Sequence, residues 1–312
     1  MDTITLKKHT TLPKPQPTEN LQLIESEFDW LLDSPTLLLD SAHPALLDAS
    51  LTDNGTTIDR KNLQSQVHLF YDMLRQRKST RLGIRYETMW QYITRLNPSR
   101  TYLGSNIQVR GISKTLGEFD LLYFCHKRQQ YVHQELAVKF YLGRPGSKGD
   151  WNDWLGPDHS DQLDKKLKRM FDQQIRLSST EEGGKILCNL LGKTKPEPWL
   201  SEILLQGYLF YPWKKSCEPP LDSNPEHLKG DWLPLKQLTA YSRAIGADSF
   251  SIPVRYQWLA LQDIDPEGEG INLSHLQQTL TELLEKIQRP VLAVAHTDSS
   301  NRLFFVAPDN WL

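Results

Sequence analysis

Two neighbouring segments of the chain, Leu116–Cys125 and Tyr131–Gly143, alternate between polar and apolar residues. Because successive side chains of a β-strand point to opposite faces, this period of two predicts two strands. The short polar segment His126–Gln130 between them favours a turn, so the strands are expected to pair as a hairpin. On each strand the ionisable side chains share a face: Glu118 and Asp120 on the first, and His133, Glu135 and Lys139 on the second.

Apolar residues that recur every three or four positions predict helices elsewhere in the chain. These helices are expected over 21–32, 62–77, 82–96, about 158–177 and 273–287. Further strands are predicted over 106–112, 199–213, 250–261, 291–295 and 302–307. The strand predicted over 250–261 contains Pro253, which places that strand at a sheet edge or a bulge. The order helix, strand, hairpin, helix predicts an α/β fold in which a mixed sheet is flanked by helices.

The length of 312 residues is enough for one large domain or two small ones. Residues 1–17 are polar and contain three prolines, so we expect a flexible tail there. The remainder, 18–312, is predicted to be a single elaborated domain with its core at about 82–177. Residues 178–312 would extend that core. The helical segment that precedes the core would cover one side of it.

Composition narrows the class of protein. The chain is 38% hydrophobic and 24% charged, which is typical of a globular protein. Its net charge of −2 means that any binding of nucleic acid must come from local patches. Neither a membrane-spanning apolar run nor a secretory signal is recognisable. The three cysteines are scattered, without the spacing of a metal site or a disulfide framework, and this fits a reducing cytoplasm.

Acidic side chains beside a lysine on paired strands suggest metal-dependent hydrolysis of phosphodiesters. Mg²⁺ and Mn²⁺ prefer oxygen ligands, and such an ion lowers the pKa of a bound water and offsets charge in the transition state. A lysine ammonium can orient the attacking water or stabilise the developing negative charge. Asp120, Glu135 and Lys139 supply these groups. Glu118, and Glu87 on the helix predicted at 82–96, are further candidates.

The segment Gly117–Leu121, followed by a strand that contains Lys139, resembles the PD-(D/E)XK nuclease superfamily. The helix that carries Glu87 is similar to the first core helix of that superfamily. More closely, the chain resembles a bacterial family of domains of unknown function, number 1853, which is assigned to the superfamily. The stretches that carry this resemblance are Leu82–Glu87 with Trp90, Gly117–Asp120, Glu135–Gly143, Trp154–Pro157, Asp161, Leu163, Lys166 and Gln174.

The resemblance implies a restriction-endonuclease-like core and a nuclease that hydrolyses DNA, with RNA as the less favoured substrate. Asp120 would be the principal ligand of Mg²⁺ or Mn²⁺, Glu135 and Glu87 would be supporting ligands, and Glu118 would be an alternative. Lys139 would orient the attacking water. No membrane partner is expected, and the oligomeric state stays open.

One position departs from the superfamily's pattern, because Ala137 stands two residues before Lys139, where an acid is usual. Glu135 lies on the same face but about 7 Å further along the strand. Three interpretations follow. Glu135 replaces the missing acid as a metal ligand, Glu87 or Glu118 replaces it, or the site is inactive. Two alternatives therefore stay open: a nuclease-like module that binds nucleic acid or protein without activity, and a solvated two-stranded ribbon with cross-strand ion pairs.

A basic cluster on the helix predicted at about 158–177 is the candidate for contacts to a nucleic-acid backbone. Lys165, Lys166 and Arg169 would neutralise phosphate charge, and Gln174 would orient a ligand or a phosphate. His133 flanks the site and is a further candidate contact. The same basic cluster is also typical of a hydrated helix face.

Overall fold

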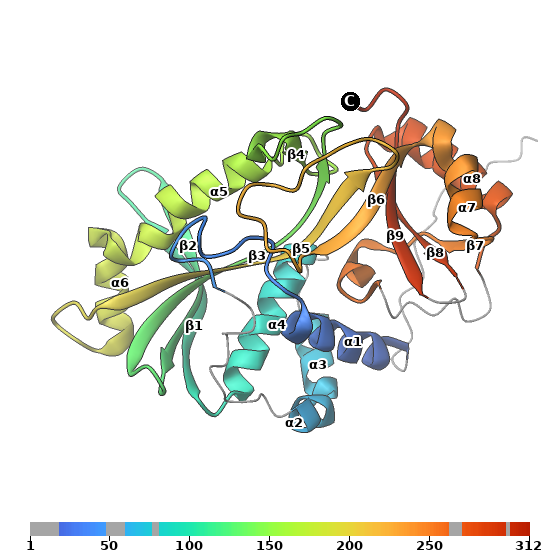
Figure 1. Cartoon of the computed structure of the whole chain (residues 1–312). Coiled ribbons are helices and arrows are strands. Elements are labelled where there is room, and N and C mark those ends of the chain that lie inside the picture. Colours follow the sequence, from blue (N-terminus) through green and yellow to red (C-terminus); the bar gives the residue numbers. More distant parts are fainter. Residues whose placement is uncertain (1–18, 48–59, 77–80, 262–269, 298–299) are drawn as a thin grey trace, which may run out of the picture.

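A computed structural model of the chain describes residues 19–47, 60–76, 81–261, 270–297 and 300–312. The flexible tail predicted at 1–17 lies outside the described residues. One nine-stranded sheet runs through the molecule, with helices on both of its faces (Figure 1). The mixed α/β architecture expected from the sequence is therefore confirmed.

The sheet combines the strands of the predicted core with those of the extension. They are β1 (Arg100–Arg110), β2 (Thr115–Cys125), β3 (Gln130–Gly143), β4 (Trp154–Leu155), β5 (Trp199–Pro212), β6 (Leu228–Pro234), β7 (Ser249–Ser251), β8 (Val291–His296) and β9 (Asn301–Ala307). Their order is β1-β2-β3-β5-β6-β9-β8-β7, with β4 paired to β3. The first three strands are antiparallel neighbours. β3, β5, β6 and β9 run parallel, and β8 and β7 are antiparallel again.

The helices vary in length. They are α1 (Glu19–Asp33), α2 (Arg60–Ser65), α3 (Val67–Gln76), α4 (Leu82–Leu96), α5 (Leu163–Asp172), α6 (Glu181–Leu191), α7 (Leu238–Ile245) and α8 (Leu273–Ile287), with the 3-10 helices η2 (Trp151–Asp153), η3 (Gln174–Ser179), η4 (Leu235–Gln237) and η5 (Arg255–Leu259). α1, α4 and α8 have 15 residues each, whereas a bilayer span needs about 20 apolar residues. Within the described residues, no helix is long and apolar enough to cross a membrane.

The helices form a layer on each face of the sheet (Figure 1). On one face, α1, α3, α4 and η5 share a buried core with β2, β3, β5, β8 and β9. On the other face, α5 packs on β3 and β5, α6 and η3 pack on β1 and β2, and α7 and α8 pack on β8 and β9. The apolar stripe of α5 shows the underlying reason, because Leu163, Leu167 and Met170 are spaced for one helix face and are all buried.

Two predicted helices differ from those in the structure. The helix predicted over 62–77 is interrupted at Gln66, whose carbonyl accepts a hydrogen bond from the Tyr92 hydroxyl at 2.9 Å. The helix predicted over about 158–177 begins only at Leu163, and its last part is the 3-10 helix η3. The periodicity also did not single out α6, α7 or β6.

The strand predicted over 250–261 is wrong beyond Ser251. Pro253 has no backbone N–H to donate to a neighbouring strand, and η5 follows it. This helix brings Trp258 against Phe140 of β3, with 5.0 Å between the ring centroids. The part after Pro253 therefore packs on a face of the sheet, whereas β7 lies at the sheet edge, as the proline predicted.

β3 lies inside the sheet, because it pairs with β2 on one side and with β5 on the other. Helices cover both of its faces, and His133 and Glu135 are fully buried. The solvated two-stranded ribbon is therefore wrong. Gly207 of β5 permits a close approach to β3, since its φ is +141° and an added Cβ would lie 1.7 Å from the carbonyl oxygen of Lys139.

Candidate active site

Asp120 lies where the pairing between β2 and β3 stops. In the described part of the chain, the two strands pair from their shared turn as far as Leu121 and Gln134 and not beyond. The backbone N–H of Leu136, just past the last pair, donates to Asp120 Oδ2 at 3.0 Å. A side-chain carboxyl group thus takes a position that a backbone carbonyl would otherwise occupy, and we call this place the β2–β3 gap.

Glu87 reaches the β2–β3 gap from α4. The side chain of Asn106 in β1 donates to Glu87 Oε2 at 3.3 Å and to Glu118 Oε1 at 3.1 Å. Gln91 holds Asn106 in turn, with 2.7 Å between Nε2 and Oδ1. Sequence reasoning missed Asn106, and the only signal is an asparagine inside a strand, where this residue type is depleted.

Glu135 approaches Asp120 from β3. His133 Nε2 lies 2.8 Å from one oxygen of Glu135, and Gln174 donates to the other. Lys166 of α5 donates to Gln174 Oε1 at 3.3 Å and so orients the amide. Glu135 also lies close enough to Asp120 for the two carboxyl groups to affect each other's pKa.

The carboxyl groups at the β2–β3 gap hold their protons tightly. Burial raises the pKa of Asp120 to about 8, and the charge of Glu135 contributes to this rise. Burial and the charge of Asp120 raise the pKa of Glu87 to about 7. Burial also raises the pKa of Glu135 to about 7, although Lys166 opposes the shift. Carboxyl groups that raise one another's pKa lie close together, and such groups gather at functional sites.

Lys166 supplies positive charge to these three carboxyl groups, because it lowers the pKa of each. Burial, followed by the like charge of Lys139, lowers the pKa of Lys166 itself. Burial lowers the pKa of His133 to about 4, so this ring is neutral at physiological pH. The cation that acts on the carboxyl groups therefore comes from α5, which sequence analysis treated as a nucleic-acid-binding surface.

Lys139 is held by a different acid. Its Nζ pairs with Asp161 Oδ2 at 2.6 Å, and Tyr141 donates to the other oxygen of Asp161 at 3.1 Å. Asp161 lies in the segment before α5, and sequence reasoning assigned it no part in the site. The ammonium predicted to orient a water is thus engaged in an ion pair at the edge of the site.

A pocket of about 380 Å³ opens beside the β2–β3 gap. Glu87, Lys139 and Lys166 line it, together with residues 136–140 of β3. Ala137 is part of that wall and contributes only a methyl group. Of the three carboxyl groups, Glu87 lines the pocket, so a ligand there would lie beside Glu87 and the two lysines.

The other predicted nucleic-acid contacts fall into two groups. Lys165 and Arg169 are exposed on α5, as a binding surface requires. His133 is fully buried and Gln174 is bonded to Glu135, so these two side chains organise the carboxyl groups.

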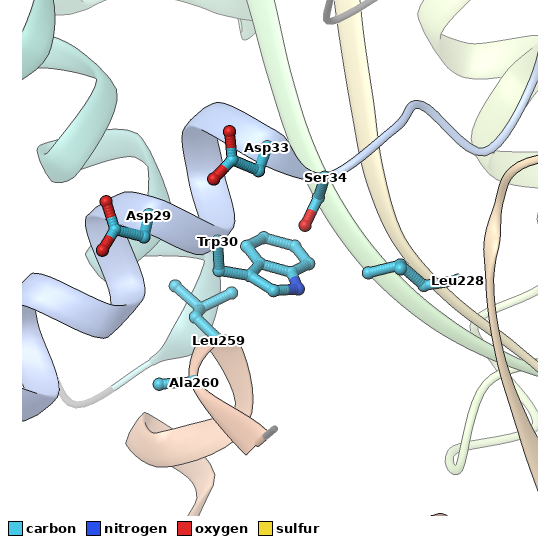
Figure 2. A pocket seen from close by; sticks show the side chains of 7 residues that line it. All are labelled: Asp29, Trp30, Asp33, Ser34, Leu228, Leu259 and Ala260. Atoms are coloured by element: carbon cyan, nitrogen blue, oxygen red, sulfur yellow. The ribbon is translucent and has the colours of Figure 1, made fainter. Parts of the chain in front are cut away.

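A second pocket, of about 200 Å³, has lining residues from α1, β6 and η5 (Figure 2). Its two acids, Asp29 and Asp33, both accept hydrogen bonds from Arg60. The Trp30 indole, in the centre of Figure 2, donates to the Tyr208 hydroxyl at 3.0 Å. The two acids and the indole of this pocket have partners within the chain, so we place the candidate site at the β2–β3 gap.

The carboxyl groups do not form a ready-made metal site. Across the described residues, no three histidine, cysteine, aspartate or glutamate side chains are grouped so that they could hold an ion as they stand. Both oxygen atoms of Glu135, and Oδ2 of Asp120, already take part in hydrogen bonds within the protein. Binding an ion here would therefore require these carboxyl groups to lose their protons and exchange these partners for the ion.

Asparagine at position 120 is expected to stabilise the fold at alkaline pH. The Asp120 carboxyl keeps its proton up to about pH 8 in the folded protein, whereas in the unfolded chain it ionises near its ordinary value of 3.8. Folding therefore becomes less favourable as the pH rises between these two values. Asp120→Asn has no group to ionise at this position, so its stability should not fall in this way. At about pH 9 the variant should be more stable than wild type by at least about 1.4 kcal/mol, the value of one pKa unit.

Urea denaturation at about pH 5 and about pH 9 measures this difference, which should grow with pH. A variant that was less stable than wild type at both values would contradict the argument from burial.

The chain resembles a known protein family over nearly its whole length. The family model described as Domain of unknown function (DUF1853) matches residues 27–305. No curated protein matches the chain, and no solved structure does. The matched span runs from α1 into β9 and includes the whole candidate site.

Proposed function

The chain belongs to the DUF1853 family, whose model matches most of its length, and we propose that it is a metal-dependent nuclease. The proposed reaction is hydrolysis of phosphodiester bonds in DNA, with RNA as the less favoured substrate. The proposed ion is Mg²⁺ or Mn²⁺. The resemblance to the PD-(D/E)XK superfamily around Asp120 and Lys139 supports the same activity.

The observation that carries this proposal is the convergence of three carboxyl groups from three elements. Glu87 comes from α4, Asp120 from β2 and Glu135 from β3, and their charges act on one another. Burying three acids together is costly unless a cation or protons compensate their charge. Such a cluster beside an open pocket offers oxygen ligands to a divalent cation once the side chains rearrange to meet the ion.

The chemistry of these donors fits Mg²⁺ or Mn²⁺, because all three are carboxyl oxygens and both ions prefer oxygen ligands. Asp120 would be the principal ligand, with Glu135 and Glu87 as supporting ligands and Glu118 as an alternative. Gln174 and His133 would orient Glu135, and Asn106 would orient Glu87. When bound, the ion would polarise a water and offset charge on the phosphate.

Lys166 is the side chain that we assign to stabilising the negative charge that develops on the phosphate. It lines the pocket, and its charge acts on all three carboxyl groups. Lys139, the residue proposed from the sequence, would support this role from its ion pair with Asp161. A cation at this position acts electrostatically without needing to reorganise during the reaction.

A binding module without catalysis is the second candidate, and Ala137 is the observation that favours it. Ala137 lines the pocket two residues before Lys139, where the superfamily's pattern has an acid. In the nuclease proposal Glu135 replaces that acid, because its charge acts on Asp120. The two candidates differ in metal-dependent cleavage, which only the nuclease would perform.

Cleavage of labelled single-stranded, duplex and branched oligonucleotides, in Mn²⁺ or Mg²⁺ and with or without EDTA, tests the proposal. Wild-type protein is expected to cut at least one substrate, and EDTA should abolish the cutting. Asp120→Asn keeps the shape of the side chain but cannot ionise to bind the ion. The rate should fall by at least about 100-fold, since even residues that only orient metal ligands are worth about 10–100-fold.

Asp248→Asn is the matched control, because Asp248 is an exposed acid before β7 and lies outside the pocket. It should cut as fast as wild type.

In the same assay Lys166→Met should slow cleavage more than Lys139→Met. The reverse order would assign the stabilisation of charge on the phosphate mainly to Lys139. Equal rates for wild type and Asp120→Asn would contradict the site. Binding without any cutting would favour the binding module.

A further inference from the structure

The pocket beside the β2–β3 gap is small. Its volume of about 380 Å³ lies near the lower end of the range for small-molecule sites, roughly 300–1,000 Å³. Strand β3 lines one part of it, and the start of α4 and the helix η5 line others. Enzymes that act on single bases hold one nucleotide in a fitted pocket, having first removed it from the stack. A pocket of this size suits one such unit and not both strands of a duplex.

Basic side chains outnumber acidic ones around this pocket. The basic lining residues are Arg81, Lys139, Lys166 and Arg255, and the acidic ones are Glu87 and Asp161. Four cations against two carboxylates leave a net charge of +2, and the excess grows when Glu87 holds its proton. The pocket therefore favours an anion, and phosphate is the anion that the proposed reaction brings.

Two aromatic side chains form an apolar part of the pocket wall. Phe140 and Trp258 both line the pocket, and they are 6% and 9% exposed, so each presents only a small part of its ring to a ligand. The guanidinium carbon of Arg255 lies 5.4 Å from the centroid of the Trp258 ring, so a cation and an indole lie at the same wall. Aromatic side chains beside cations are the combination with which proteins hold unpaired bases and their backbone.

We propose that this pocket binds one unpaired nucleotide, and that the substrate of the site is a single strand or a frayed end. The inference rests on the proposed nuclease function, because it places a phosphate beside the same carboxyl groups. The basic side chains would bind the phosphate, and the base would lie against the apolar wall to which Trp258 and Phe140 contribute. A continuous duplex would have to open before it could enter. Single-stranded DNA and RNA share this chemistry, and the experiment separates them.

Binding measured without cleavage tests this inference apart from the proposed function. In EDTA, fluorescence anisotropy would compare labelled single-stranded DNA and RNA of about 12 nucleotides with a blunt duplex of the same sequence. Wild type is expected to bind at least one single strand about tenfold more tightly than the duplex. Arg255→Glu reverses a charge at the pocket and should weaken that binding about tenfold. Arg243→Glu reverses an exposed charge on α7, outside the pocket, and should stay within about twofold of wild type.

The outcomes separate the two proposals. The inference is overturned if the duplex binds as tightly as both single strands, or if Arg255→Glu and Arg243→Glu weaken binding equally. Single-strand binding that depends on Arg255, without any metal-dependent cleavage, would support the pocket's assignment and contradict the nuclease. Metal-dependent cleavage of the duplex in preference to single strands would support the nuclease and contradict this inference.

Discussion

The affinity of the protein for Mn²⁺ is expected to rise at least about 100-fold between about pH 6 and about pH 8. An ion binds these carboxyl groups only when they are ionised, and burial raises the pKa of Glu87 and of Glu135 to about 7. A group with such a pKa becomes about tenfold more ionised over this interval, so two of them give about 100-fold. Asp120, whose pKa is about 8, would add to the increase.

Titration calorimetry in two buffers of different ionisation enthalpy measures both the affinity and the protons released. Near pH 7 wild type should release about one to two protons for each ion bound. Glu87→Gln removes one titrating ligand and should flatten the pH dependence, whereas Asp248→Asn should leave it unchanged. An affinity that stayed constant over this pH range, or binding without proton release, would exclude the three carboxyl groups as the ligands.

Replacing Arg85 by methionine is expected to lower the free energy of unfolding by about 3–5 kcal/mol. Arg85 Nε donates to Glu27 Oε1 at 2.6 Å and its Nη2 donates to Oε2, which joins α4 to α1. Glu27 is fully buried, and burial raises its pKa although Arg85 opposes that shift. Without the guanidinium, the carboxyl group must hold a proton or stay buried as an unpaired charge. The loss of stability should therefore increase as the pH rises above the ordinary pKa of glutamate.

Urea denaturation measures this effect, and two further variants isolate its cause. The double variant Glu27→Leu with Arg85→Met should recover most of the loss, because apolar residues often replace a buried ion pair at little cost. Arg289→Ala breaks an exposed pair with Asp158, at 3.0 Å, and should cost less than about 1 kcal/mol. If Arg85→Met and Arg289→Ala had equal effects, the buried pair would not be what holds α4 on α1. Glu87 lies on α4 two residues after Arg85, so the same pair helps to position the candidate site.

Elements with a strong internal period are predictable from the sequence alone. The helix predicted at 82–96 has the bounds of α4, and the strand predicted at 199–213 agrees with β5 to within one residue. Asn272 caps α8 as a helix-starting residue should, by accepting a hydrogen bond from the N–H of His275 at 2.9 Å. Prediction failed where a local feature interrupts the pattern, as at Gln66 and Pro253.

The acids of the candidate site were also accessible to sequence reasoning, because alternation along a strand shows which side chains share a face. It predicted that Asp120 and Glu135 project from adjacent strands, and in the structure these strands pair and the charge of Glu135 raises the pKa of Asp120. The sequence thus determined the candidate acids, the hairpin that carries two of them and the helix that carries the third.

Only the tertiary structure decided how those acids are paired, because periodicity cannot tell what packs on a face. Lys139 pairs with Asp161, 22 positions along the chain, whereas Lys166 reaches Glu135 through Gln174, 39 positions from that acid. Helices that cover both faces of β3 remove the acids from water, and this burial is the main reason why their pKa values rise. Partners and burial depend on distances between segments that lie far apart in the chain, which a local pattern does not contain.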